Sequence, residues 1–205
     1  TGLNVFYDCS IKDISKYIDW TFFFSAWGMK GRYPEILADA EKSSEAEKLL
    51  SDAQLLLEKI HNEKLIKAKA VVGVFPANSV GDDIEVYSDE KKDTVINKFF
   101  HLRQQVKSDS PNLCLSDFIA PKDSGKTDYI GFFAVTAGLE VESLVASYEK
   151  EGDVYNSIMI KAVTDRLAEA LAEMIHEKVR RDLWAYSTDE KLNLHDLLRN
   201  KYKGI

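Results

Sequence analysis

VYNSIMIKAVTDRLAEALAEMIHEKVRRDLWAY, residues 154–186, contains neither Gly nor Pro and is predicted to form one long helix. At about 1.5 Å per residue the helix would span roughly 50 Å, which is longer than most helices in globular domains. Gly152 and Asp153 precede it and predict a break in the chain followed by an N-cap. Apolar residues recur at three- and four-residue spacing and predict one buried stripe: Ile160, Val163, Leu167, Ala170, Leu171, Met174, Ile175 and Val179.

A second side of this helix combines small residues with ionisable ones. Its members are Ala162, Ala168, Ala172, Asp165, Glu169 and His176. Small side chains allow another backbone or a flat ligand to approach closely, so this side is a candidate wall of a binding site. The alternative is a solvated polar face on which the alanines serve only the stability of the helix.

The composition is that of an ordinary globular protein. The chain has 205 residues, of which 45% are hydrophobic and 30% charged, enough for one domain or at most two small ones. A net charge of −7 without a long run of like charges argues against a nucleic-acid or anionic-membrane surface. No apolar run approaches the roughly 20 residues that cross a bilayer. The first residues do not form a signal peptide.

Two cysteines, Cys9 and Cys114, are too few for a disulfide framework. Reduced thiols in a cytoplasmic protein are therefore expected. The sequence does not begin with Met, so we also expect it to be a piece of a longer protein.

The remainder of the chain predicts helices, then strands, then helices. A short helix is expected up to Asp19, and a second one starting at Ser44, which would form a capping box with Glu47. Strands are expected at residues 68–75 and 83–87, joined by the turn-rich connection PANSVGDD. Further expected elements are a strand and then a helical turn within 93–106, strands at 114–121 and 128–138, and helices at 140–150 and after Asn193.

This order lacks regular βαβ alternation, so it favours an α+β fold with a mostly antiparallel sheet. We place the strand at 128–138 centrally in that sheet, because it is apolar on both faces.

Common catalytic and nucleotide-binding motifs are missing from the sequence. His176-Glu177 resembles the start of a zinc-protease helix, but Arg180 stands where the second His would be needed. No GxSxG, Walker-type or GxGxxG pattern occurs.

Three carboxylates remain as candidate site residues. Asp19 lies in an aromatic setting and would either bind a ligand's ammonium or hydroxyl groups or cap the next turn. Asp82 and Asp83 would orient a loop or serve turn chemistry.

Seven motifs occur in collinear order: YIDWTFFFSAW, GRYP, VVGVFPANSVGDDIEVY, LRQQ, CLSDFIAPKDSGKTDYIGFFAV, SIMIKAVTDRLAEALAEMIHEKVRRDLWAY and KYKGI. Together they closely resemble the C-terminal activation domain of cobalamin-dependent methionine synthases, over nearly the whole chain. Several long motifs in order are far more specific than one short pattern.

The resemblance implies a C-shaped α+β domain with a twisted, mostly antiparallel sheet and long flanking helices. It implies binding of S-adenosylmethionine (AdoMet) in a groove. The parent enzymes transfer a methyl group from 5-methyltetrahydrofolate to homocysteine through cobalamin, which is occasionally oxidised to the inactive cobalt(II) form. The activation domain then docks on the cobalamin domain, and an electron from a flavodoxin-type donor and the AdoMet methyl group restore methylcobalamin.

The family's AdoMet-contacting residues fall on Asp19 in the YIDW motif and on Glu169 in the DRLAEA helix. Carboxylates in a partly dry groove attract the sulfonium and α-ammonium groups of AdoMet. Asp165, one turn before Glu169, would contribute to docking. The resemblance implies no metal ligand, nucleophile or general base in this chain, whose part would be positioning.

In the family, a segment RPAPGYP follows the position of Ile205, and its Arg and backbone supply much of the AdoMet site. We therefore expect residues 1–205 to be an activation domain that is incomplete at its C-terminus and binds AdoMet weakly or not at all by itself. The alternative hypothesis is a non-catalytic docking module for a cobalamin domain or a flavodoxin-type partner.

Overall fold

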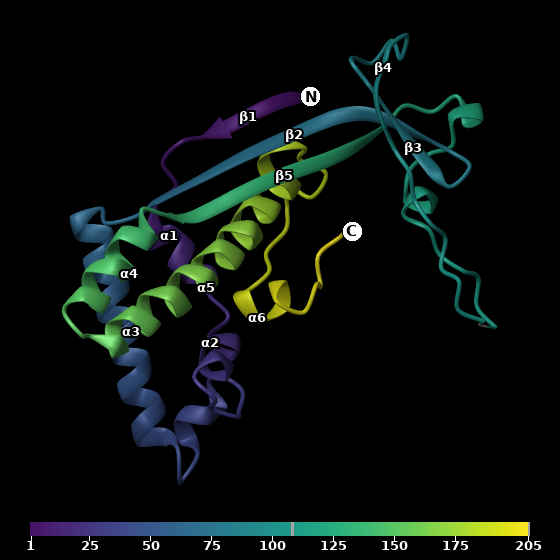
Figure 1. Ribbon diagram of the computed structural model, residues 1–205. Coiled ribbons are helices and arrows are strands. Elements are labelled where there is room, and N and C mark those ends of the chain that lie inside the picture. Colours follow the sequence, from purple (N-terminus) through teal and green to yellow (C-terminus); the bar gives the residue numbers. More distant parts are fainter. Residues whose placement is uncertain (108, 205) are drawn as a thin grey trace. The chain divides into compact units, whose positions relative to one another are not determined.

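The computed structural model describes residues 1–107 and 109–204. Ser108 and Ile205, the last residue of the KYKGI motif, lie outside the described residues. The chain forms two compact units, one from residues 1–4 and 72–133 and the other from residues 5–71 and 134–204. Figure 1 shows the order of helices and strands along the chain. The expected α+β class with an antiparallel sheet is confirmed.

The helical unit is organised around α5 (Val154–Lys178), as the sequence predicts. Asp153 is the N-cap, and its carboxylate accepts a hydrogen bond from the Asn156 backbone N–H at 3.0 Å. Every residue of the predicted apolar stripe is buried except Met174, which is partly buried. A π-turn at Val179–Leu183 follows the helix, so the predicted run to residue 186 is slightly too long.

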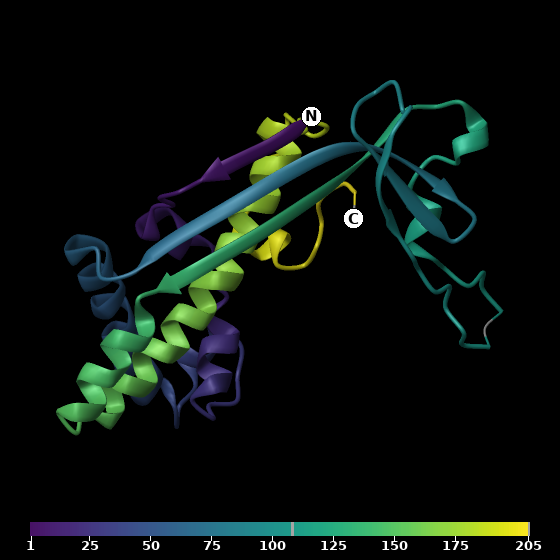
Figure 2. The ribbon, with the colours of Figure 1, turned by 45° about the horizontal axis from the view of Figure 1, so that its top comes forward.

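Several shorter helices pack on α5. They are α1 (Ile11–Ile14) with a 3₁₀ turn at Ser15–Tyr17, α2 (Trp20–Ala26), α3 (Ser43–Glu63) and α4 (Val141–Lys150). Figures 1 and 2 both show α4 lying beside α5. The last helix, α6 (Leu194–Leu197), is capped by Asn193 as expected, but it is only four residues long.

The predicted capping box at Ser44 is wrong. Helix α3 begins at Ser43, one residue earlier, so Ser44 lies within its first turn. The cap position, Lys42, makes no side-chain capping bond. Asp39 accepts hydrogen bonds from the backbone N–H groups of Glu41 and Lys42 instead. The carboxylate of Asp39, four residues before the first residue of the helix, thus orders the chain at the helix start, a role that the sequence pattern assigned to a serine.

The sheet contains β1 (Gly2–Phe6), β2 (Lys67–Val80), β3 (Asp83–Tyr87), β4 (Val95–Phe99) and β5 (Asp128–Leu139). Its order is β1-β2-β3-β4, and β5 also pairs with β2, alongside which it runs in Figure 2. The pairs β2–β3 and β3–β4 are antiparallel. The central placement predicted for residues 128–138 is therefore wrong, because the long strand β2 takes that position.

The predicted loop PANSVGDD is also largely strand. Strand β2 continues to Val80, which pairs with Asp83 across the two-residue turn Gly81-Asp82. Asn78 is fully buried within it, and its side-chain amide donates to the carbonyl oxygens of Ala120 and Lys126 at 2.9 and 3.1 Å. Hydrogen bonds to residues distant in the sequence thus satisfy the buried amide of Asn78, although asparagine considered by itself favours turns.

Two further predictions fail in the same unit. Residues 114–121 form a 3₁₀ turn at Leu115–Phe118 rather than a strand, because Asp117 accepts the backbone N–H of Cys114 at 2.9 Å. The helical turn expected after β4 is irregular backbone, in which Arg103 binds Asp117 and Asp82 at 2.7 Å. A strand at 95–99 is confirmed.

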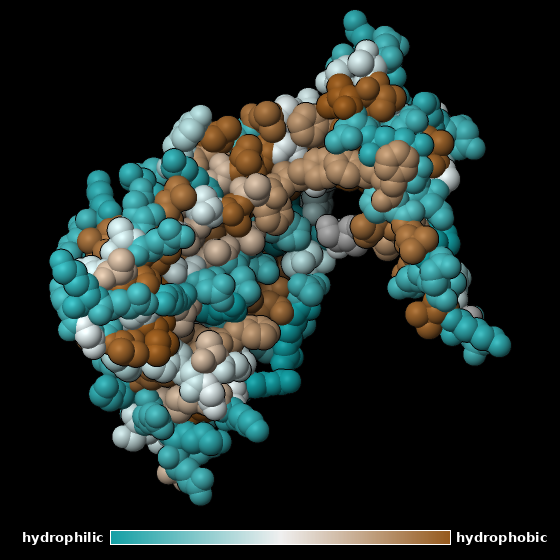
Figure 3. All heavy atoms as spheres, viewed as in Figure 1, coloured by the Kyte–Doolittle hydropathy of each residue, from teal (hydrophilic) through white to brown (hydrophobic). Residues whose placement is uncertain are grey.

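Exposed apolar side chains gather around β4 and the segments that follow it. Figure 3 shows brown residues over β4, and the exposed set includes Val95, Ile96, Phe100, Leu102, Leu113, Leu115 and Phe118.

Among the described residues, no helix is long and apolar enough to cross a bilayer. Cys9 and Cys114 are both buried free thiols, as expected.

Candidate functional site

Asp19 lies at the start of α2, in the helical unit. Its backbone is extended, and its carboxylate accepts a hydrogen bond from the Thr21 backbone N–H at 2.9 Å. The capping role that the sequence allowed is therefore present. Capping uses one carboxylate oxygen, and the side chain is only partly buried. The second oxygen retains acceptor capacity for a cation or hydroxyl group.

Glu169 lies on the polar side of α5 and is already paired with a cation. Arg166, one turn earlier, binds it with two hydrogen bonds, Nη1 to Oε2 at 2.7 Å and Nη2 to Oε1 at 3.0 Å. The Glu169 side chain is 62% exposed, whereas that of Arg166 is only 13% exposed. The carboxylate therefore faces solvent while the guanidinium beneath it is held in the protein.

A contact between α2 and α5 links the two predicted residues. The Arg166 guanidinium lies 5.7 Å from the centre of the Phe22 ring, and Phe22 is in the first turn of α2, which Asp19 caps. Helices α2 and α5 are packed against each other along this line. The contact between Phe22 and Arg166 therefore joins the helix that Asp19 caps to the helix that carries Glu169.

The other carboxylates from the sequence analysis are engaged elsewhere. Asp165 is 71% exposed on its side chain and binds the same guanidinium, Arg166 Nη2, at 2.6 Å. Asp82 and Asp83 lie in the strand-rich unit, where they pair with Arg103 and Lys98 respectively. Their role is to hold the turn after β2 and the neighbouring backbone, which agrees with the turn chemistry considered from the sequence.

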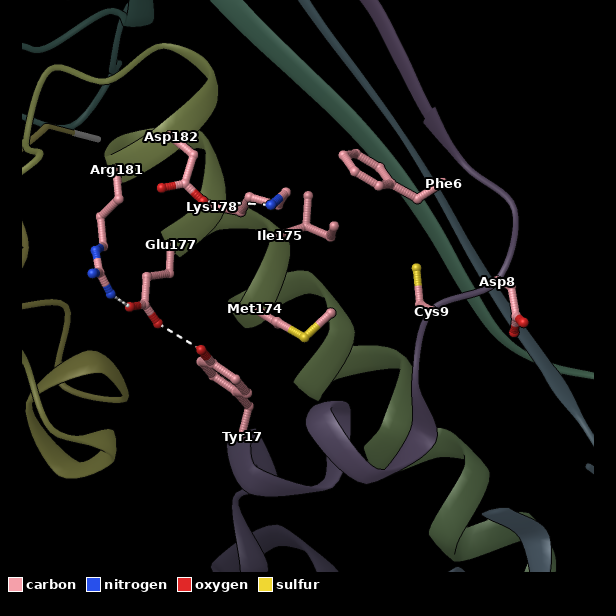
Figure 4. A pocket seen from close by; sticks show the side chains of 10 residues that line it. All are labelled: Phe6, Asp8, Cys9, Tyr17, Met174, Ile175, Glu177, Lys178, Arg181 and Asp182. Carbon is pink, nitrogen blue, oxygen red and sulfur yellow. Dashed lines mark hydrogen bonds and ion pairs between the residues drawn. The ribbon is translucent and has the colours of Figure 1, made fainter. Parts of the chain in front are cut away.

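A cavity of about 400 Å³ lies beside α5, but neither Asp19 nor Glu169 lines it. Figure 4 shows its side chains, which come from α5, from the π-turn and from the segments before α2. They are Phe6, Asp8, Cys9, Tyr17, Met174, Ile175, Glu177, Lys178, Arg181 and Asp182. The cavity is therefore separate from the pair of carboxylates that the sequence singled out.

Four charged side chains of this cavity form two ion pairs, Glu177 with Arg181 and Lys178 with Asp182. Glu177 accepts hydrogen bonds from the Tyr17 hydroxyl at 2.7 Å and from Arg181 Nη1 at 2.6 Å, as the dashed lines of Figure 4 show. Burial, together with the bond to Glu177, raises the pKa of Tyr17 to about 12. Lys178 pairs with Asp182 at 3.4 Å.

A buried polar cluster at the end of α5 was not predicted. Arg180 is fully buried and donates to both oxygens of Glu190 at 2.8 and 2.6 Å. Its guanidinium also lies 4.2 Å from the centre of the Tyr202 ring, and His176 meets the same ring edge-on. In the sequence, Arg180 stood out only because it occupies the position where a zinc-protease helix would need its second His. His176 and Glu177 stand four and three residues before Arg180, so helical spacing places it on a polar side and gives no signal of its burial.

Burial perturbs two more groups of this cluster. It raises the pKa of the Glu173 carboxyl, against the opposing effect of the Arg180 charge, and it lowers the pKa of His176. Glu173 Oε2 and Arg180 Nη1 have no hydrogen-bond partner within the described part of the chain. The cluster fixes the segment around Tyr202 against α5, on the helix that also carries Glu169.

Residues 10–205 match the sequence model of a known family, the activation domain of vitamin B12-dependent methionine synthase. The chain belongs to this family. It also resembles a solved structure, the crystal structure of the MetH reactivation domain bound to AdoHcy, with a TM-score of 0.96 and 50% sequence identity over 100% of the chain. The chain spans 63% of the length of that structure's chain.

Membership of the activation-domain family confirms the resemblance drawn from the collinear motifs. The solved relative has the same mixed fold as the chain described above. Asp19 and Glu169 both lie within the matched residues. Their assignment as ligand contacts stays a prediction.

Proposed function

We propose that this activation-domain chain contributes an AdoMet site to its natural gene product and takes part in the reductive reactivation of a cobalamin-dependent methionine synthase. Family membership over residues 10–205 carries the proposal, and the AdoHcy-bound relative supports it. AdoMet would supply a methyl group on a positively charged sulfur. The parent enzyme would be cytoplasmic and would transfer a methyl group from 5-methyltetrahydrofolate to homocysteine.

Asp19 and Glu169 are the proposed contacts. They lie on neighbouring helices and are connected through Phe22 and Arg166. A carboxylate with a free acceptor oxygen is a strong partner for an α-ammonium group, since charge-assisted bonds are about twice as strong as neutral ones. These residues would bind and orient the ligand, while the methyl acceptor, cobalamin, would be held by a partner domain. A flavodoxin-type protein would be the electron donor.

Isothermal titration calorimetry tests the proposal. AdoMet is titrated into this chain and into the natural gene product that contains it. Asp19→Asn removes a charge but keeps the N-cap, because Asn caps as well as Asp. Both Asp19→Asn and Glu169→Gln are expected to weaken binding about tenfold, which corresponds to the loss of one charge-assisted hydrogen bond.

Asp165→Asn is the matched control, because Asp165 is on the same helix and binds the same arginine. It should change the affinity by less than Glu169→Gln does. Unchanged affinity in Asp19→Asn and Glu169→Gln would contradict their assignment. Failure of both wild-type proteins to bind AdoMet would contradict the proposed function itself.

The second candidate is a docking module that does not bind AdoMet. One observation favours it: the Glu169 carboxylate is already paired with Arg166, so it is a weaker partner for a ligand cation. This candidate predicts binding to a cobalamin domain or flavodoxin-type protein, measurable by the same calorimetry, without any heat from AdoMet.

A further inference from the structure

Arg166 is held by three neighbours and is almost withdrawn from solvent. Its guanidinium makes two hydrogen bonds to Glu169 and one to Asp165, and it lies over the Phe22 ring. Its side chain is 13% exposed, whereas both carboxylates are largely exposed. Fixed geometry of this kind distinguishes the cluster from a mobile surface ion pair, whose interaction is weak.

The charge that Glu169 presents outward is therefore reduced. A ligand placed near Glu169 interacts with a carboxylate and a guanidinium together. At separations of about 6 Å, a single unpaired charge changes the affinity for a cation by roughly threefold to tenfold in a partly solvated site. Arg166 offsets one of the two carboxylate charges, those of Asp165 and Glu169, so the cluster keeps a net charge of −1 and a smaller preference than it would have without the arginine.

The two ligand forms of the reaction differ by one charge. AdoMet carries a sulfonium, whereas AdoHcy, the ligand in the solved relative, has a neutral thioether in its place. Both carry the same α-ammonium and carboxylate groups. Methyl transfer breaks the S–CH₃ bond and leaves its electron pair on sulfur, while the acceptor supplies the pair of the new bond. The positive charge on sulfur thus disappears along the reaction.

We propose that Arg166 is a specificity-determining residue, which reduces the preference of this site for AdoMet over AdoHcy by offsetting one of the two negative charges, those of Glu169 and Asp165, that it binds. The proposal rests on the proposed function. An unpaired carboxylate beside the sulfonium would stabilise the charged substrate more than a transition state in which the charge is dispersing, and would slow methyl transfer. Arg166 prevents this while leaving Glu169 able to accept a hydrogen bond from the α-ammonium group.

Charge-balance variants test this role through the ratio of two dissociation constants, that of AdoHcy divided by that of AdoMet. Calorimetry is performed on the natural gene product. Arg166→Gln should raise the ratio about fivefold, because Glu169 loses its partner. Glu169→Gln should lower the ratio, because Asp165 then balances Arg166 and the cluster has no net negative charge. The double variant should return the ratio to the wild-type value.

Arg181→Gln is the matched control. Arg181 is on the π-turn after the same helix and pairs with Glu177 at 2.6 Å, away from Asp19 and Glu169, so the ratio should not change. Arg166→Lys keeps the positive charge and should retain a ratio near the wild-type value. If Arg166→Gln does not fold, Glu169→Gln alone tests the inference. The ratio of the two dissociation constants should then fall in that variant.

Equal weakening of both ligands in Arg166→Gln and in Glu169→Gln, with an unchanged ratio, would overturn the inference and leave Arg166 as a structural link between α2 and α5. Wild-type protein that binds neither ligand would overturn the proposed function, and the inference with it. These two failures are distinguishable, since the first requires measurable wild-type binding and the second excludes it.

Discussion

The Arg180–Glu190 ion pair offers the sharpest test of what stabilises the helical unit. The Arg180 side chain is 0% exposed and that of Glu190 is 5% exposed. Two hydrogen bonds join them, and they tie the chain after the π-turn to the end of α5. Glu190→Gln removes the negative charge while keeping nearly the same shape. The guanidinium then remains buried without a carboxylate hydrogen-bonded to it.

The expected loss is large for a single substitution. Breaking a buried ion pair by removing one partner costs about 3–5 kcal/mol. Gln retains one hydrogen-bond acceptor, so we expect a value of about 3 kcal/mol, at the lower end of that range. For a chain of this size each kcal/mol lowers the melting temperature by about 2–4 °C. The melting temperature should therefore fall by about 6–12 °C.

Differential scanning calorimetry measures this shift. Glu149→Gln is the control, because it also removes one glutamate from an ion pair, with Lys161, whose two side chains are each 56% exposed. Exposed pairs contribute little, so the control should shift the melting temperature by no more than about 1–2 °C. Equal shifts for Glu190→Gln and Glu149→Gln would refute the reasoning from burial.

The pH dependence provides a second readout of the same pair. Hydrogen bonds from Arg180 hold the pKa of the Glu190 carboxyl below its usual range. A lowered pKa in the folded state contributes stability above the unfolded-state value of about 4.3, and this stability is lost as the pH falls through the folded-state pKa. The gap in melting temperature between wild type and Glu190→Gln should therefore shrink below about pH 4.

Three further predictions concern other buried or capping groups. Asn78→Ala removes the buried donor to two backbone carbonyls and should lower the free energy of unfolding by about 1–3 kcal/mol in urea titrations; an unchanged midpoint would contradict this. Burial raises the pKa of Glu173, so its charged form is disfavoured in the fold. Glu173→Gln should raise the melting temperature at pH 7 but much less at pH 4, and equal effects at both pH values would be incompatible with this origin. Asp19→Ala should destabilise the chain by about 1 kcal/mol through loss of the α2 cap, whereas Asp19→Asn should not.

Helices with a strong periodic pattern were predicted well from the sequence. The stripe on α5, its N-cap Asp153 and the cap Asn193 all follow from spacing and local hydrogen bonding. These features depend on residues within a few positions of one another. The prediction of a capping box at Ser44 was wrong although it too relied on nearby residues. Asp39, another nearby residue, accepts the backbone N–H groups of Glu41 and Lys42, and α3 begins one residue earlier than expected.

Strand boundaries were predicted less well, because their partners are distant in the sequence. Pro, Asn and Ser between residues 76 and 79 indicate a turn when read alone. In the fold, Asn78 and Ser79 find acceptors at residues 119, 120 and 126, and β2 continues through them. Similarly, residues 114–121 are diverted from a strand by the bonds of Asp117 to Cys114 and Arg103.

The sequence by itself determined the long amphipathic helix, the α+β class and, through collinear motifs, the family to which the chain belongs. Through the same resemblance it also predicted Asp19 and Glu169 as ligand contacts. Only the tertiary structure decided what surrounds them: that Asp19 caps α2, that Glu169 is paired with Arg166, and that the contact of Phe22 with Arg166 joins the two helices. Periodicity fixes which face of a helix is buried, since it depends on the helix alone. The partner of a charged side chain depends on which helices pack together, and no local pattern contains that information.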